Sequence, residues 1–355
     1  MIHPVQFIRS ASDALQTLLY THWKKYSQVV VMTDKNTSEH CLSHFRNTFV
    51  NRDFIHIPLP ELTEENKKLR SIENIVAKLM YTQVDRNAAI VALGGGVVTD
   101  TVGFAASVYK RGIHLYLIPT TLLGMVDAAL GGKTGVNFNG IKNQVGSFYF
   151  PREVIIDPGY LATLPRREWE SGFAEMIKHG LIADYAYFEQ LINRLASGKM
   201  TDKLMEHIIR SVEIKMRIIQ TDFRESGKRK TLNFGHTVGH ALEACAWQNG
   251  IPISHGYAVA LGMAVETALS VENAGMEKAT SRKIIRRLLE VYPVPGDING
   301  TITDCVLEAM KHDKKNTGDE PSFVLLQAPG EPVCNKKIPE SEIREAINRT
   351  LFPGN

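Results

Sequence analysis

The feature of this sequence that most constrains its fold is an alternation of short β-branched runs with helical patterns over about the first 150 residues. The runs that we interpret as strands are residues 28–32, 54–57, 88–93 and 114–118. Strand–helix–strand units of this kind place parallel strands side by side and cover the sheet with helices. We therefore predict an α/β domain with a parallel sheet at residues 1–165.

The remaining residues, 166–355, have helical periodicity instead. Long amphipathic segments span residues 168–195, 201–220, 231–247, 255–274 and 279–292. A lone strand at residues 322–328 and a closing helix at residues 340–351 follow. The pattern predicts an all-α second domain. Because ligand sites occur preferentially between domains, we expect the functional site in the cleft between the two.

Composition and charge exclude several classes of protein. The 355 residues carry 41 Lys and Arg against 38 Asp and Glu, a net charge of +3, which is not the concentrated positive field of a nucleic-acid-binding protein. The most apolar run, residues 88–98, is shorter than the roughly 20 residues needed to span a bilayer. Residues 1–10 lack the basic and apolar regions of a secretory signal. We expect a cytoplasmic protein with neither nucleic-acid nor membrane partners.

The cysteines form no recognisable motif. Cys41, Cys245, Cys305 and Cys334 are scattered along the chain, and no pair has the C-x-x-C spacing of a thiolate zinc site. We therefore predict that all four are reduced thiols.

A glycine triplet, Gly94-Gly95-Gly96, lies between a predicted strand and a predicted helix. Glycines in this context let backbone N–H groups approach a pyrophosphate at the helix N-terminus. The spacing is not G-x-G-x-x-G, and a triplet alone is equally typical of a tight turn, but the strand–glycine–helix context favours a dinucleotide. Asp34 and Asn36 follow an earlier strand. Their side chains could either accept hydrogen bonds from ribose hydroxyls or cap a helix.

A second glycine-rich segment, residues 127–137, reads as a loop, with Lys133 inside it and Lys142 shortly after it. The two lysines could hold an anion. The segment is not a Walker A loop, because Asp127 occupies the position where that motif requires its first glycine. An ATPase is therefore a poor interpretation.

Histidines and a carboxylate in the helical half fit a metal site. His236 and His240 are spaced i, i+4, His255 follows, and Glu175 lies three residues before Lys178. One Glu and two His with an open position is the pattern of catalytic zinc, whereas structural zinc is closed by four protein ligands. An isolated H-x-x-x-H more often packs or faces solvent, but the Glu and the third His favour a metal.

Cationic residues accompany these motifs. Each alone is best explained as a solvated surface charge, but together with a metal and a dinucleotide they indicate a phosphorylated, hydroxylated small substrate. They are Arg111, Lys133, Lys142, Lys178, Lys215 and Arg229.

Taken in order, these motifs resemble those of the 3-dehydroquinate synthases, within the sugar phosphate cyclases. The resemblance runs from about residue 34 to residue 326 and rests on residues 94–100, 119–123, 126–137, 142–143, 174–178, 232–240 and 255–256. It implies an N-terminal Rossmann-like NAD-binding domain, a C-terminal helical domain for metal and substrate, and a homodimer.

The resemblance also implies roles for individual residues. Zinc, or cobalt in its place, would be held by Glu175, His236 and His255. NAD would be held by Asp34, Asn36, Glu64, Lys67, Gly95, Gly96, Asp100, Thr120, Thr121 and Lys142. The substrate would be held by Asp127, Lys133, Asn143, Lys178, Lys215, Arg229, Asn233 and His240, with Arg111 on its phosphate and either Lys314 or Lys315 as a further contact. His240 then faces the substrate, which replaces the interpretation of H-x-x-x-H as two metal ligands.

The implied reaction converts 3-deoxy-D-arabino-heptulosonate 7-phosphate to 3-dehydroquinate and phosphate, a step of the shikimate pathway. It proceeds by transient oxidation of the C5 hydroxyl, elimination of phosphate, re-reduction, ring opening and an intramolecular aldol reaction, without net redox change. The substrate phosphate can itself act as the base, so we assign no protein base.

Three positions depart from the family pattern. Tyr257 stands where His-Gly is usually followed by Glu, Thr99 stands where Gly is commoner, and Thr63 precedes Glu64 in place of Gly. Tyr257 removes a carboxylate beside a proposed metal ligand, so the orienting partner of His255 is expected to differ.

Other functions stay open from the sequence alone. Other sugar phosphate cyclases act on sedoheptulose 7-phosphate or glucose 6-phosphate, and the segments 131–135 and 233–236 favour the dehydroquinate enzyme over them. A metal-dependent polyol dehydrogenase would produce net NADH and would not need the cations. The nearly complete set of proposed ligands argues against a non-catalytic nucleotide- or metal-binding protein.

Overall fold

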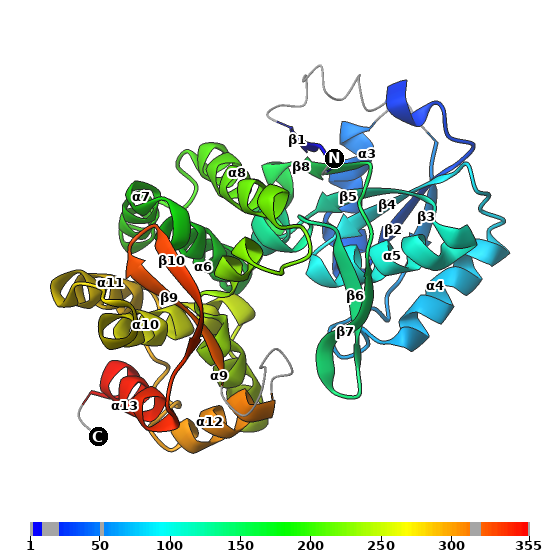
Figure 1. Ribbon diagram of the computed structural model, residues 1–355. Coiled ribbons are helices and arrows are strands. Elements are labelled where there is room, and N and C mark those ends of the chain that lie inside the picture. Colours follow the sequence, from blue (N-terminus) through cyan, green and yellow to red (C-terminus); the bar gives the residue numbers. More distant parts are fainter. Residues whose placement is uncertain (1–2, 9–20, 50–52, 313–320, 354–355) are drawn as a thin grey trace. The chain divides into compact units, whose positions relative to one another are not determined.

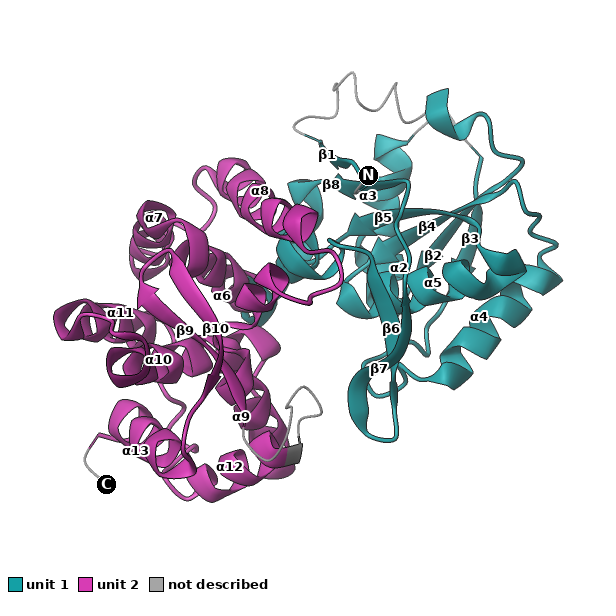
Figure 2. Ribbon diagram, in the orientation of Figure 1, with its two compact units in different colours: residues 1–169 teal, residues 170–355 magenta. Residues whose placement is uncertain are grey.

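The computed structural model describes residues 3–8, 21–49, 53–312 and 321–353, and the chain divides into two compact units (Figures 1 and 2). Unit 1 comprises residues 1–169 and unit 2 comprises residues 170–355. The division falls near the start of helix α6, Arg166–Ala183. No helix in the described part of the chain is long and apolar enough to cross a membrane.

Unit 1 is built on a six-stranded sheet in the order β1-β8-β5-β4-β2-β3, in which every neighbouring pair is parallel. The strands are β1 Val5–Phe7, β2 Val29–Thr33, β3 Ile55–Pro58, β4 Ala89–Gly94, β5 His114–Pro119 and β8 Glu153–Ile156. The central strands are buried along their length, as expected where helices cover both faces of a parallel sheet. The predicted fold class is confirmed, and the four predicted strands are β2, β3, β4 and β5.

Helices connect these strands. They are α2 Lys35–His40, α3 Leu42–Thr48, α4 Leu69–Tyr81 and α5 Gly96–Val108, with the short helical turns η1 Tyr109–Arg111, η2 Gly124–Ala128 and η3 Pro158–Thr163. Helices α4 and α5 lie side by side (Figure 1). Helix α5 buries the apolar side chains of Val98, Val102 and Ala105, which suits a helix packed against the sheet.

Part of the segment predicted as a glycine-rich loop is a strand. Strand β6, Lys133–Phe138, pairs antiparallel with β7, Ile141–Phe148. Asn139 and Gly140 join them with φ of 49° and 79°, the left-handed geometry of a tight hairpin turn. The hairpin packs closely on α5: a Cβ at Gly103 would lie 2.7 Å from Thr134 Cγ2.

Unit 2 is mostly helical, as predicted, and carries one hairpin. Its further helices are α7 Tyr185–Ala196, α8 Leu204–Thr221, η4 Lys228–Asn233, α9 His236–Gln248, α10 His255–Ala274, α11 Lys278–Val291, α12 Ile302–His312 and α13 Glu340–Leu351. The segment predicted as one helix at residues 168–195 is two helices, because Asp184 caps α7 by accepting from Tyr187 N at 3.1 Å. The prediction of a lone strand is wrong: β9, Ser322–Ala328, pairs antiparallel with β10, Glu331–Lys337.

The prediction of four reduced thiols is also wrong. Cys245 on α9 and Cys305 on α12 form a disulfide, with Cα atoms 6.0 Å apart. The two helices share a buried core that includes Leu242 and Val306. Because the cysteines are 60 residues apart in the sequence, only the packing of the helices brings them together. Cys41 and Cys334 are free thiols.

We expect the disulfide to stabilise unit 2. Closing a loop of 60 residues removes about 4 kcal/mol of chain entropy from the unfolded state in the loop-closure treatment. Cys305→Ser should therefore lower the free energy of unfolding, measured by denaturant titration without reductant, while Cys334→Ser should leave it nearly unchanged. Alkylation of the unfolded, oxidised protein should label two cysteines, and labelling of all four would contradict the disulfide.

Candidate functional site

The sheet of unit 1 has a topological switch point between β2 and β4. The chain leaves β2 for β3 on one side and later returns to β4 on the other side. In such sheets, ligands bind in the crevice at the carboxyl ends of the strands. Asp34 directly follows β2, Gly95 directly follows β4 and Thr120 directly follows β5, so these proposed cofactor residues share the carboxyl edge of the sheet.

The glycine triplet allows a tight passage from β4 into α5. A Cβ at Gly94 would lie 2.5 Å from Val98 Cβ, and a Cβ at Gly95 would lie 3.0 Å from Thr121 Cγ2. Gly95 is the N-cap of α5 and gives it no side-chain cap. The first amide groups of a helix lack intrahelical acceptors and favour an anion, which suits the pyrophosphate predicted here.

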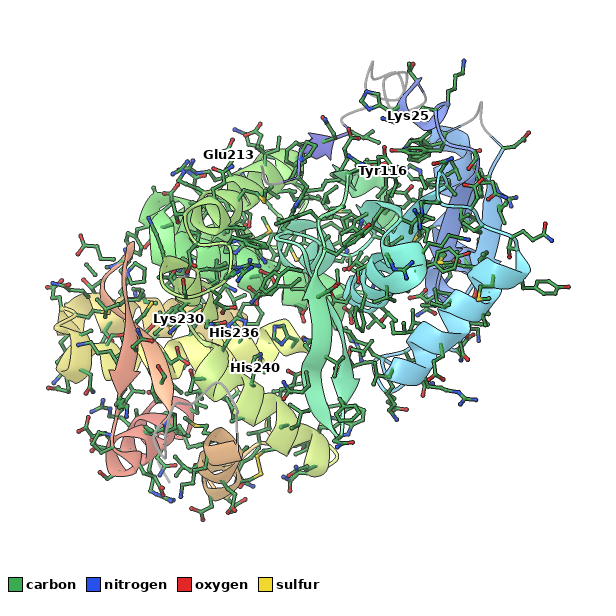
Figure 3. The ribbon with its side chains drawn as sticks, turned by 45° about the vertical axis from the view of Figure 1, so that its right-hand side comes forward. Lys25, Tyr116, Glu213, Lys230, His236 and His240 are labelled. Carbon is green, nitrogen blue, oxygen red and sulfur yellow. A yellow bond between two sulfur atoms is a disulfide. The ribbon has the colours of Figure 1, made fainter. Side chains whose placement is uncertain are left out.

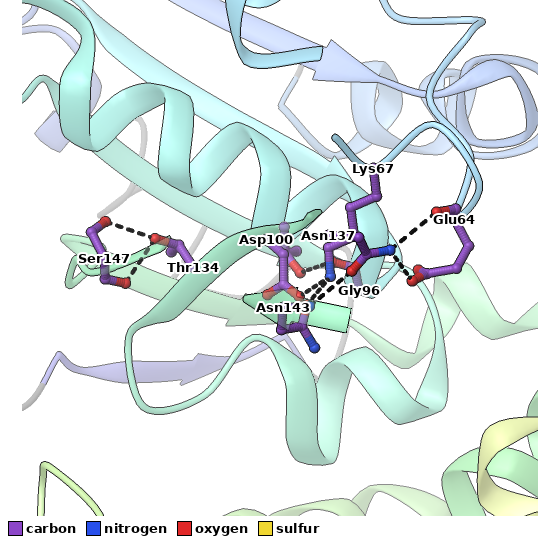
Figure 4. Close-up of polar contacts among 9 residues, drawn as sticks. Glu64, Lys67, Gly96, Asp100, Thr134, Asn137, Asn143 and Ser147 are labelled. Carbon is purple, nitrogen blue, oxygen red and sulfur yellow. Dashed lines mark hydrogen bonds and ion pairs between the residues drawn. The ribbon is translucent and has the colours of Figure 1, made fainter. Parts of the chain in front are cut away.

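Five polar residues form a connected cluster next to this turn (Figure 4). The buried Lys67 donates through Nζ to Asp100 Oδ2 at 2.6 Å and to Asn143 Oδ1 at 2.7 Å. Asn143 N donates to Asn137 Oδ1 at 2.8 Å, and Asn137 Nδ2 donates to Glu64 Oε1 at 2.9 Å. Four of the five are proposed site residues; Asn137 lies in a motif that carries the resemblance, which assigns it no role.

The cluster is electrostatically coupled. Burial raises the pKa of Asp100, against the opposing effect of the Lys67 ammonium, and the carboxylates of Glu64 and Asp127 raise it further. Asp127 thus lies near enough to influence Asp100, although it belongs to the turn after β5. Residues proposed for NAD and residues proposed for substrate therefore meet in one part of unit 1.

Other proposed residues of unit 1 bond to residues near them in the sequence or are exposed to solvent. Asp34 caps α2, because its Oδ1 accepts from Thr37 N at 2.7 Å and from Thr37 Oγ1 at 2.8 Å. The helix cap, one of the two interpretations of Asp34, is therefore observed. Asn36 is exposed in the same helix. Thr121 Oγ1 accepts a hydrogen bond from Gly124 N at 3.0 Å. Lys133 and Lys142 are exposed on the β6–β7 hairpin.

Arg111 lies away from these residues within unit 1. It ends η1, just before the amino end of β5, whereas Thr120 follows the carboxyl end of that strand. The six residues of β5 span roughly 17 Å at about 3.3 Å per residue. The structure therefore does not bring Arg111 together with Asp100 and Asn143.

The metal ligands implied by the resemblance come together around a buried carboxylate in unit 2. Glu175 on α6 is fully buried, and its Oε2 contacts Nζ of Lys178, one turn along the helix. Its Oε1 lies 3.6 Å from His236 Nε2 and 3.6 Å from His255 Nε2. Ligand atoms of a tetrahedral zinc ion are about 3.4 Å apart when each bond is about 2.0–2.2 Å. The spacing therefore fits a divalent cation.

Both histidines present the same nitrogen to Glu175. His236 Nδ1 lies 3.2 Å from the carbonyl oxygen of Phe234, and His255 Nδ1 lies 3.3 Å from Glu243 Oε2. An acceptor at Nδ1 favours a proton on that nitrogen and leaves Nε2 as the lone-pair donor. This is how metal-binding imidazoles are held.

His240 lies beside the two proposed ligands. It follows His236 by one turn of α9 (Figure 3), and one nitrogen from each of His236, His240 and His255 lies within 4.8 Å of the others. Three imidazoles could also hold a metal. The set with Glu175 also gives the buried carboxylate a role.

Electrostatics keep this carboxyl group ionised. Burial opposes ionisation of Glu175, but the Lys178 ammonium and the imidazole of His236 hold its pKa well below its usual range. Burial lowers the pKa of His255, whereas the carboxylates of Glu175 and Glu243 raise it, to about 9. At neutral pH Glu175 is thus a carboxylate, and a divalent cation that binds there would displace the proton from His255.

Glycines bring the three helices that carry these ligands into backbone contact. A Cβ at Gly256, beside His255, would lie 2.2 Å from the Ser171 carbonyl oxygen of α6. A Cβ at Gly262 on α10 would lie 2.1 Å from the carbonyl oxygen of Gly235, which precedes His236 with φ of 79°. The glycines next to the histidines in the sequence therefore serve the packing of α6, α9 and α10.

Sequence reasoning missed Glu266. This fully buried residue of α10 accepts from Gly235 N at 2.6 Å and from Val238 N at 3.2 Å, at the start of α9. Burial raises its pKa to about 8, and the backbone donors oppose the rise. Its carboxyl group takes the place of the side-chain cap that Gly235 cannot provide. The signal in the sequence is an acidic residue in the otherwise uncharged run at residues 256–271.

The other proposed substrate residues of unit 2 include buried cations. Lys178, Lys215 and Arg229 are 1%, 5% and 3% exposed, and buried positive charge favours an anionic ligand. Arg229 Nη1 donates to the Phe223 carbonyl oxygen at 2.7 Å, and Asn233 Nδ2 donates to Glu225 Oε1 at 2.7 Å. Lys314 and Lys315 lie outside the described residues.

Comparison with known proteins agrees with the resemblance. Residues 57–171 match the family model of the 3-dehydroquinate synthase N-terminal domain, and residues 172–316 match that of its C-terminal domain. The 3-dehydroquinate synthase of Parabacteroides distasonis is 39% identical over 326 residues, which cover 91% of each chain.

Solved structures extend the comparison. The chain is 25% identical to a 2-deoxy-scyllo-inosose synthase complexed with carbaglucose-6-phosphate, NAD+ and Co2+, at a TM-score of 0.85, covering 98% of this chain and 96% of that one. It is 27% identical to a 2-epi-5-epi-valiolone synthase from Streptomyces hygroscopicus subsp. jinggangensis with NAD+ and Zn2+ bound, at a TM-score of 0.83, covering 99% and 97%. The fold and the two domain matches agree, and the chain belongs to the 3-dehydroquinate synthase family and is an enzyme of that type.

Proposed function

We propose that this enzyme converts 3-deoxy-D-arabino-heptulosonate 7-phosphate to 3-dehydroquinate and phosphate, as a phosphate-eliminating carbon–oxygen lyase. The observation that carries the proposal is the buried Glu175 carboxylate facing Nε2 of His236 and of His255, in a chain of this family. Its structural neighbours have NAD+ bound with Co2+ or Zn2+, which supports the same cofactors here.

Glu175, His236 and His255 would hold a zinc or cobalt ion. Three protein ligands leave a position for a substrate hydroxyl, as in catalytic zinc sites. When bound, the divalent cation lowers the pKa of a coordinated hydroxyl, and NAD reversibly accepts a hydride. Lys178 keeps the Glu175 carboxylate ionised, and His240 would face the substrate from the next turn of α9.

NAD would bind along the carboxyl edge of unit 1. The backbone at Gly95 and Gly96 would receive the pyrophosphate at the N-terminus of α5. The other proposed contacts are Asp34, Asn36, Glu64, Lys67, Asp100, Thr120, Thr121 and Lys142. Lys67 is fixed by Asp100 and Asn143, so its ammonium is already oriented before a ligand arrives.

Cations would hold the acidic substrate and stabilise the charge of the leaving phosphate. The buried Lys178, Lys215 and Arg229 are suited to this, because a charge in a dry site interacts more strongly with its ligand than one in water. The other proposed contacts are Asp127, Lys133, Asn143, Asn233, His240, Arg111 and one of Lys314 and Lys315. With the substrate phosphate as base, these residues would orient the reacting groups rather than move the proton.

A different sugar phosphate cyclase activity is the second candidate, because the two solved neighbours are inosose and valiolone synthases. Sequence identity favours the first candidate: it is 39% with a 3-dehydroquinate synthase and 25% and 27% with the two neighbours.

The proposal is tested by turnover. With 3-deoxy-D-arabino-heptulosonate 7-phosphate, NAD and zinc, the enzyme should release phosphate and 3-dehydroquinate in equal amounts without net NADH. Chelation should abolish the reaction and added zinc should restore it. Turnover of sedoheptulose 7-phosphate in place of this substrate would overturn the proposal in favour of another cyclase, and net NADH would indicate a dehydrogenase.

We also propose that the enzyme is a homodimer and that Arg111 acts across its interface. We propose the cytoplasm as its location, where the Cys245–Cys305 disulfide would be an exception to the reduced state of most thiols. The proposal on Arg111 rests on its position in unit 1, at the amino end of β5 and about one strand length from Thr120 at the carboxyl end. If Arg111 contacts the phosphate, a second subunit would have to supply it.

Mixed dimers test this arrangement. Arg111→Ala and Lys178→Ala should each be nearly inactive as homodimers. After co-refolding, the mixed dimer should regain one complete site, with about half the activity of a wild-type dimer, because the Lys178→Ala chain lends its Arg111 to the other chain. A monomeric mass of 39.6 kDa in light scattering, or no recovery in mixed dimers, would contradict the proposal.

A further inference from the structure

His255 lies between two carboxylates. Its Nε2 is 3.6 Å from Glu175 Oε1, and its Nδ1 is 3.3 Å from Glu243 Oε2. The two carboxylates come from different helices, α6 and α9, whereas His255 begins α10. The two nitrogens of one imidazole therefore face two separate acidic groups.

The residue after the His-Gly pair does not serve as this partner. Tyr257 donates through its hydroxyl to the carbonyl oxygen of Pro293 at 2.5 Å. Its ring makes an edge contact with Tyr292, at 5.4 Å between centroids. Tyr257 thus packs against the segment after α11, and it has no carboxylate to offer His255.

We infer that Glu243 is the positioning residue of His255. It takes a role that the residue after His-Gly cannot fill in this chain, because Tyr257 has no carboxylate. This inference rests on the proposed function, because it assigns His255 Nε2 to the metal. A carboxylate that accepts from Nδ1–H fixes the tautomer and the ring orientation, and it makes Nε2 a stronger ligand. Glu243 itself would not touch the metal.

The geometry of α9 explains why one residue can serve this purpose. Glu243 follows His236 by seven residues, about two helical turns, so the two side chains lie on the same face of α9. Helix α9 therefore supplies one metal ligand and the group that orients another. Contact between α9 and α10 keeps this relation fixed: a Cβ at Gly239 would lie 2.9 Å from Val259 Cα.

The two proposed imidazole ligands differ in how they are held. The Phe234 carbonyl oxygen that faces His236 Nδ1 is backbone, so no side-chain substitution removes it. The partner of His255 is a side chain, and the His255 side chain is 29% exposed against 12% for His236. Loss of Glu243 should therefore free His255 while Glu175 and His236 stay in place.

Cobalt binding by the full-length apoenzyme tests the inference. Glu243→Ala should weaken Co2+ affinity, measured by competition with a chelating dye, by about 10- to 100-fold, and it should change the visible absorption of the bound ion. Glu243→Gln should lose less, because its amide oxygen can still accept from Nδ1–H. Thermal midpoint and NAD affinity should match those of the wild type, which a merely structural role of Glu243 would not allow.

Two control variants test whether the loss of Co2+ affinity is specific to Glu243. Tyr257→Phe removes the hydroxyl next to the His-Gly pair, and Glu272→Gln removes an exposed carboxylate from α10. Both should bind Co2+ within about twofold of wild type. Wild-type affinity and an unchanged absorption spectrum in Glu243→Ala would overturn the inference, as would a loss of affinity in Tyr257→Phe that equals that of Glu243→Ala.

Failure of the inference can be told apart from failure of the proposed function. The cobalt titration needs no turnover, so a wild type that binds Co2+ but does not form 3-dehydroquinate would overturn the proposed reaction and leave the role of Glu243 standing. A wild type that turns over and a Glu243→Ala variant that binds Co2+ equally well would overturn the inference alone. A wild type that binds no Co2+ would overturn both.

Discussion

The burial of the Glu175 carboxylate is the constraint on which the organisation of unit 2 depends. A fully buried charge is tolerated only where opposite charge and polar groups compensate for the lost water. Here the compensation comes from Lys178 on the same helix and from His236 and His255 at the starts of two others. Folding unit 2 around this group brings three helix segments together and assembles the ligands of a divalent cation in the same step.

Close backbone packing makes that assembly possible. Gly256 lets α10 approach α6, and Gly235 and Gly262 let α9 approach α10, while Glu266 satisfies the amides at the start of α9. Unit 1 uses a different principle, because its parallel sheet gathers the ends of β2, β4 and β5 at one edge. Each unit thus presents polar groups from segments far apart in the sequence.

Much of this organisation was predictable from the sequence. Periodicity gave α10 and α13 with their observed bounds, and the motifs singled out the residues that meet at Glu175. What stayed hidden depends on contacts between distant segments. Strand β1 is too short to carry a pattern, β10 has a bulge and many polar residues, and the Cys245–Cys305 pair has no local spacing. The partners Glu243 and Glu266 read as ordinary helix residues until α9 and α10 are packed together.

The position of a bound metal ion tests the role of Glu175 most directly. Anomalous scattering from crystals of the enzyme grown with Zn2+ should show one strong peak within about 2.0–2.2 Å of an oxygen of Glu175 and of Nε2 of both His236 and His255. His240 should lie farther away and make no bond to the ion. A peak held by His236, His240 and His255 without Glu175, or no peak near these residues, would contradict the account.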